Sequence, residues 1–198
     1  MKVIYSLITI VIIFSTIVVA RESGETEITT DDGIEVFQNE KYYLLKKNVR
    51  IVSDNFILSA DDVKIDFDQS LYDITEINAQ GDVKFNSTEY SIKGNSKSLK
   101  FEVKEEILNL KGAGSELITE DIVMISDGTI TLNNHNGNFS LQGLNSKLIN
   151  DSILIQAESI NGIFSNTNNK KEITHLNIID NKISYIKNND TDMYAKKI

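Results

Sequence analysis

The chain has 198 residues, a formal net charge of −9 at pH 7, and no cysteine, proline or tryptophan. The lack of cysteine excludes disulfides and cysteine-type zinc sites, and the acidic balance argues against nucleic acid and against a broad basic surface for anionic headgroups. The length is sufficient for one domain with a sizeable core.

The first 20 residues have the pattern of a secretory signal peptide. Lys2 supplies a positive charge, residues 3–19 are almost all apolar, and residues 18–20 (Val-Val-Ala) fit a cleavage site. We expect cleavage after Ala20. The alternative is an uncleaved anchor, because about 17 apolar residues stand at the short limit of a bilayer span. In either case the remainder lies outside the cytoplasm, and residues 21–32 are expected to form a flexible, acidic lead-in.

From Ile34 onward, apolar and polar residues alternate with a period of two, which is typical of β-strands. In residues 63–67 (Val-Lys-Ile-Asp-Phe) the apolar side chains share one face and the charged ones the other. Similar runs recur at intervals of about 8 to 12 residues, with Gly, Asn, Asp and Ser in the gaps. The sequence therefore predicts an all-β fold of about 14 to 16 short antiparallel strands. Residues 166–198 are expected to be a polar extension, with one or two strands and then a frayed tail.

Related phrases recur every 30 to 36 residues or so, a spacing typical of repeating architectures. One series contains residues 81–85 (Gly-Asp-Val-Lys-Phe) and 114–117 (Gly-Ser-Glu-Leu). A stack of such strands makes one continuous apolar inner face, which either fills itself as a sealed core or holds an apolar ligand. The pattern alone leaves both interpretations open. The residues expected to line this face are Val49, Ile51, Val63, Ile65, Phe67, Val83, Phe85, Leu99, Phe101, Leu108, Leu110, Ile130 and Leu132.

Residues with catalytic or metal-binding potential are sparse. The two histidines, His135 and His175, lie in polar contexts, and the sequence has no nucleophile elbow and no glycine-rich phosphate loop. Acid pairs such as Asp61-Asp62 fall at turns, and adjacent acids in a strand point to opposite faces. We therefore expect no enzymatic activity, no metal site and no cofactor.

Two stretches resemble a known family. Residues 59–68 (Ser-Ala-Asp-Asp-Val-Lys-Ile-Asp-Phe-Asp) and 77–85 (Ile-Asn-Ala-Gln-Gly-Asp-Val-Lys-Phe) are similar to the OstA-like domain of LptA-like periplasmic lipopolysaccharide-transport bridge proteins. Residues 108–112 (Leu-Asn-Leu-Lys-Gly) resemble the Leu-x-Leu-x-Gly step of that family. The resemblance covers about residues 33–165, which we expect to form the OstA-like domain.

The resemblance implies an open, twisted β-roll (a β-jellyroll) in the periplasm, whose apolar interior shields lipopolysaccharide acyl chains during transport from the inner to the outer membrane. It also implies head-to-tail docking with β-roll proteins of the inner- and outer-membrane complexes, or with further copies of the chain. Without proline the sheet edges are not blunted, and the expected edge strand for partner addition is Tyr42, Tyr43, Leu44 and Leu45. The alternatives are a membrane-anchored β-roll component of the same pathway, or an exported structural or adhesive β-solenoid with a sealed core.

Overall fold

The computed structural model describes residues 24–119, 121–150, 152–167, 170–188 and 191–197. The expected signal segment and its cleavage site lie outside the described residues. Within the described ranges, no helix is long and apolar enough to cross a membrane.

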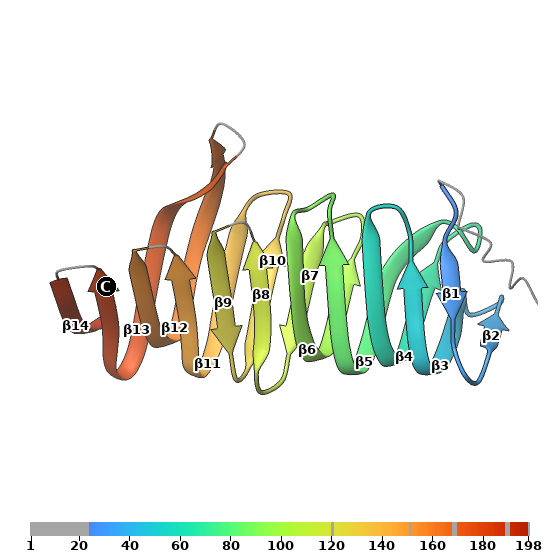
Figure 1. Ribbon diagram of the computed structural model, residues 1–198, viewed down its shortest axis with the longest axis horizontal. Helices are drawn as coiled ribbons and strands as arrows, with labels where there is room; N and C mark the ends of the chain where they lie inside the picture. Colours follow the sequence, from blue (N-terminus) through green and yellow to red (C-terminus); the bar gives the residue numbers. More distant parts are fainter. Residues whose placement is uncertain (1–23, 120, 151, 168–169, 189–190, 198) are drawn as a thin grey trace, which may run out of the picture.

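The described residues form β-strands that join into one antiparallel sheet (Figure 1). The strands are β1 (Glu27–Thr29), β2 (Ile34–Phe37), β3 (Tyr42–Val52), β4 (Phe56–Phe67), β5 (Ile74–Ser87), β6 (Ile92–Glu102), β7 (Ile107–Lys111), β8 (Ser115–Thr119), β9 (Ile122–Ser126), β10 (Thr129–Asn133), β11 (Asn138–Asn150), β12 (Ile153–Thr167), β13 (Lys170–Asn188) and β14 (Thr191–Lys197). The predicted fold class is confirmed: the chain is an all-β, open β-roll.

The sheet is folded lengthwise into two layers, because the long strands bend in the middle. One half of β6 pairs with β7 and the other half with β8, and β11 pairs in the same way with β10 and β9. We call the layer that contains β7 and β10 the first layer, and the layer that contains β8 and β9 the second. In Figure 1 the bends lie along the lower edge and the hairpin turns along the upper edge. We call the upper edge the rim.

The bends are built from bulges and left-handed backbone. The pairing register shifts in β4 between Ser59 and Asp62, and in the neighbouring strand β5 between Gln80 and Val83. Gly81 lies at this bend with φ of 74°, and a Cβ atom there would come within 2.0 Å of Asp61 Oδ2. Glycine suits this left-handed backbone, and any larger residue would have to displace the Asp61 side chain of the neighbouring strand β4.

Small side chains fill the inner angle of the bends. Ser96, Ser115, Ser126, Ser146 and Ser184 are all buried where the two layers converge. The Ser126 hydroxyl donates to the Gln142 carbonyl oxygen at 3.0 Å and lies 3.2 Å from the Ser146 hydroxyl. Since larger side chains would force the layers apart, this line of serines allows the fold to close along one edge.

Strand lengths differ from the sequence expectation. The acid pair Asp61-Asp62, expected at a turn, instead forms the bulge within the single long strand β4. Charged side chains reach water at a bulge as well as at a turn, so an acid pair is compatible with either.

The C-terminal segment is also more regular than the expected frayed tail. β14 pairs with β13, and the rings of Tyr185 and Tyr194 are 5.1 Å apart across this pair. Cross-strand aromatic contacts of this kind stabilise a terminal hairpin.

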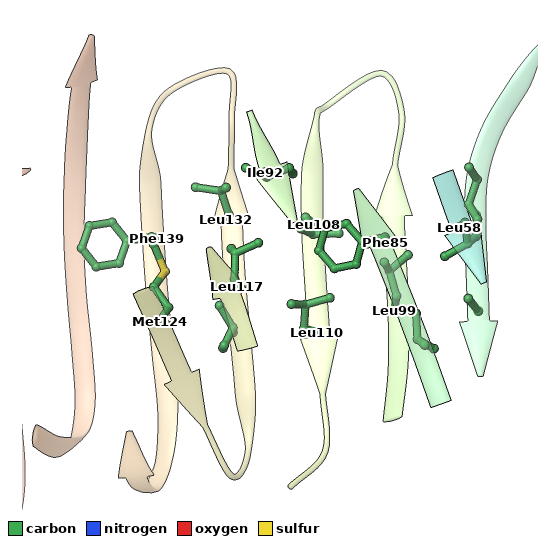
Figure 2. Packing of buried hydrophobic residues seen from close by; sticks show 14 of the residues in the cluster. Leu58, Phe85, Ile92, Leu99, Leu108, Leu110, Leu117, Met124, Leu132 and Phe139 are labelled. Atoms are coloured by element: carbon green, nitrogen blue, oxygen red, sulfur yellow. The ribbon is translucent and has the colours of Figure 1, made fainter. Parts of the chain in front are cut away.

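A continuous hydrophobic core lies between the layers. It extends from Tyr43 in β3 to Ile186 in β13 without interruption. Figure 2 shows Leu110, Leu117 and Met124 pointing into the space between the layers, each from a different strand. Burial of a leucine-sized side chain contributes about 1.5–3 kcal/mol, so this core is the main source of stability in a chain without disulfides.

Candidate functional site

The apolar interior is the candidate site, and the structure brings the predicted lining residues together in it. All of these residues except Phe101 are buried within one cluster, and Phe101 is half-buried against that cluster. They are contributed by both layers. In β4 and β6 the inward alternation shifts by one residue at the bulge, so that apolar side chains face the interior on both sides of the bend. Their contact with a ligand stays a prediction.

Sequence reasoning missed a large part of the interior. Leu58, Leu117, Met124, Phe139 and Leu148 are as deeply buried as the predicted residues. The strands that carry them were recognisable, but β9 reads Ile-Val-Met-Ile-Ser, with apolar residues on both faces. Because β9 lacks polar alternation, its sequence does not indicate which of its side chains face the interior.

The interior is closed in a different way on its two long sides. At the bends the strands continue from one layer into the other. At the rim, no strand pairing joins the two layers among the described residues. The layers meet there through side chains: the ring of Tyr90, in the hairpin between β5 and β6 of the second layer, contacts the ring of Phe101 in the first layer, edge to face at 6.1 Å.

Tyr90 reaches across the rim to a charged neighbour. Its pKa is raised, first by burial and then by the negative charges of Glu106 and Glu89. Glu106 belongs to the hairpin between β6 and β7 of the first layer, so the phenol lies near the opposite row of hairpins. The rim is therefore bridged by side chains that can move without breaking strand pairing.

The interior offers little chemistry beyond apolar contact. The buried polar residues among those described are serines and a threonine, with no buried charge. Thr119 Oγ1 and Ser184 Oγ have no hydrogen-bond partner. Across the described ranges, no group of three or more His, Asp or Glu side chains is placed to hold a metal ion. The interior is therefore an apolar core with a few hydroxyl groups.

The expected partner edge, Tyr42 to Leu45, does not lie at an edge. β2 pairs with this half of β3 on one side, with Ile34 opposite Leu45, and β4 pairs with it on the other. Tyr43 and Leu45 are buried. The sequence pattern predicts the first strand at Tyr42, because β2 is too short to show a clear alternation. In the structure the edge at this end consists of β1 and β2. At the other end, β13 is the one neighbour that β14 has among the described strands.

The chain is similar to proteins of lipopolysaccharide transport. Residues 27–138 match the family model of the LptA/(LptD N-terminal domain) LPS transport protein. Among solved structures, the chain is similar to LptH, the LptA homologous periplasmic component of the lipopolysaccharide transport device from Pseudomonas aeruginosa. The identity is 11%, the TM-score is 0.47, and the match covers 56% of this chain and 76% of that one. No curated protein matches the chain.

Proposed function

Since the chain belongs to the family of LptA and LptD N-terminal domain lipopolysaccharide transport proteins, we propose that it is a periplasmic bridge protein that shields the acyl chains of lipopolysaccharide between its two layers. The observation that carries the proposal is the unbroken apolar interior from β3 to β13. Such an interior offers the same kind of wall at every strand.

The physical basis is the cost of exposing acyl chains to water. Each methylene group gains about 0.8 kcal/mol on leaving water, so a chain of about 12 carbons gains up to roughly 9 kcal/mol before ordering costs. Because neighbouring strands present similar side chains, a lateral step along the roll is nearly isoenergetic. Transport through this chain is then a passive slide, driven by an energised partner at the inner membrane.

The rim is the proposed entrance. The interior is filled by its own side chains, with Leu110 and Leu117 fully buried. Acyl chains therefore need the layers to separate slightly, and the rim is the side where only side-chain contacts such as Tyr90 with Phe101 have to part. The sugar and phosphate headgroup then stays in solvent outside the rim.

A structural β-solenoid with a sealed core is the second candidate, and the same complete packing of the interior favours it. It differs in one respect: its layers would stay together in the cell and capture no lipid. The membrane-anchored component of the same pathway differs only in keeping its N-terminal segment. Identifying the N-terminal residue of the mature protein distinguishes the two.

Site-specific photo-crosslinking in cells tests the proposal. A photoreactive amino acid is placed at Phe101, which faces the interior, and at its neighbour Lys100, which faces outward and pairs with Glu76 and Glu102. We expect lipopolysaccharide to be captured at position 101 and not at position 100. Capture at neither position in a folded protein would support the sealed core instead.

A further inference from the structure

The outer surface of the first layer changes in character along the roll. Over β4–β6 it is charged, with Lys64, Glu76 and Lys100 in ion pairs. Over the first-layer parts of β7, β10, β11, β12 and β13 it is mostly polar. Its charged side chains at the described outward positions are Lys111, next to a bend, and Glu172, which lies opposite Ser165 where β12 and β13 extend beyond the rim. In a chain with a net charge of −9, carboxylates are therefore scarce on this surface.

A row of amides and hydroxyls crosses these strands in register. It consists of Asn109, Thr131, Ser140, Asn161 and Asn177, each opposite the next on the neighbouring strand. All five are half-buried on the outer surface. With strands about 4.8 Å apart, the row is about 19 Å long. We call the outer surface of the first layer over β7, β10, β11, β12 and β13, which contains this row, the amide face.

Hydrogen bonds within the amide face hold its side chains in place. The Thr131 hydroxyl donates to Asn109 Oδ1 at 2.8 Å, and the Ser140 hydroxyl donates to Asn161 Oδ1 at 2.7 Å. Asn161 Nδ2 in turn donates to the Ser159 hydroxyl at 3.0 Å. Each amide keeps further donor or acceptor capacity, so the face presents fixed, uncharged groups of both kinds.

We infer that the amide face binds uncharged sugars of the lipopolysaccharide saccharide while the acyl chains occupy the interior. Sugar hydroxyls both donate and accept hydrogen bonds, and amide and hydroxyl side chains match both roles without the desolvation cost of a charge. This inference rests on the proposed function, because it takes the saccharide from the same cargo molecule.

The amide face begins where the headgroup leaves the interior. Its outermost residues, Asn138 and His175, lie next to the rim. Together with Asn161 and Asn177 they line a surface depression of about 340 Å³. A saccharide that emerges at the rim therefore meets this depression first and can continue over the row toward the bends.

A titration with lipid-free saccharide tests the inference. The probe is the saccharide released from lipopolysaccharide by mild acid, added to the ¹⁵N-labelled protein. We expect changes in NMR chemical shift that are confined to the amide face and include the side-chain amides of Asn109 and Asn161. The double variant Asn109→Asp/Asn161→Asp keeps both acceptor oxygens for Thr131 and Ser140 but adds charge, and we expect it to bind about tenfold more weakly or worse.

Controls separate this inference from the proposed function. Asn86→Asp, on the outer surface of the second layer, should bind the saccharide like the wild type. Acyl chains bound per protein are measured for each variant after loading with intact lipopolysaccharide, and should not change. Two results would overturn this inference and leave the proposed function intact. One is a protein that binds acyl chains but shows no chemical-shift change with the saccharide; the other is a double variant that binds the saccharide as well as the wild type. Binding of a chitin hexamer in place of the saccharide would overturn the assignment to the cargo.

Discussion

Leu117 and Ile118 are neighbours in β8 that face opposite sides of the second layer. Leu117 has no exposed surface, whereas Ile118 is half-buried on the outer face. We expect Leu117→Ala to lower the free energy of unfolding by about 2–5 kcal/mol, because it leaves a cavity in the core. Ile118→Ala should cost about 1 kcal/mol or less. Urea unfolding followed by circular dichroism measures both, and equal costs would contradict the assignment of the interior.

Glu76 predicts a pH dependence of stability. Burial by itself would raise its pKa, but hydrogen bonds from Asn78 and Lys100, together with the charge of Lys100, outweigh burial and lower the pKa below the ordinary value of 4.5. A carboxylate with a lowered pKa stabilises the folded state above about pH 4.5, and this contribution is lost as the pH falls through the folded pKa.

The variant Glu76→Gln removes the titrating group. We expect the wild type to lose stability more steeply than Glu76→Gln as the pH falls below about 4.5, and the two curves to run parallel above it. Urea midpoints at a series of pH values measure this difference. Identical slopes throughout the acid range would show that the Lys100 pair does not hold the carboxylate in its charged form.

At the scale of the elements, the rim is the part of the fold that has to move. Because the chain has no cysteine, a short bis-maleimide linker can join an introduced pair alone. In Tyr90→Cys/Phe101→Cys the linker ties the two layers together at the rim. We expect loading with lipopolysaccharide to fall to background after crosslinking and to recover in the unlinked variant.

The matched control ties strands within one layer. Asn86 and Lys93 pair in register on the outer face of the second layer, so linked Asn86→Cys/Lys93→Cys should load normally. Normal loading by the protein linked at the rim would contradict entry between the hairpin rows.

The alternation of single elements predicted which way their residues face, but not how the elements continue. Val63, Ile65 and Phe67 face inward as the pattern requires. The bend at Asp61-Asp62 could not be told from a turn, because polar residues suit both. The contact of Tyr90 with Phe101 also escaped prediction, since it depends on how the two layers face each other at the rim.

At the scale of the whole molecule, the expected head-to-tail docking would use the sheet edges at the two ends of the roll. In β2, Ile34 and Val36 are 51% and 47% exposed. Lysines on an edge strand oppose further strand addition, so we expect Ile34→Lys/Val36→Lys to abolish head-to-tail association without unfolding the protein. Light scattering over a range of concentrations, and capture of partner β-roll proteins, measure association.

A control for this variant changes exposed apolar residues away from the edge. Leu71 and Tyr72 lie in the hairpin between β4 and β5, and Tyr72 is 94% exposed. Leu71→Lys/Tyr72→Lys should associate like the wild type. Association that survives the β2 variant would show that docking does not use this edge.

The most direct test of the central claim is to locate the acyl chains relative to the methyl groups of the protein. A deuterated protein with labelled Ile, Leu, Val and Met methyl groups is loaded with protonated lipopolysaccharide, and intermolecular nuclear Overhauser effects are recorded. The outer face of the second layer carries its own reference row, Ile118, Val123 and Ile149, paired in register. We predict contacts from acyl methylenes to Leu117 and Met124 and none to this row. Contacts to the outer row alone, in a loaded complex, would contradict the claim that the acyl chains lie between the layers.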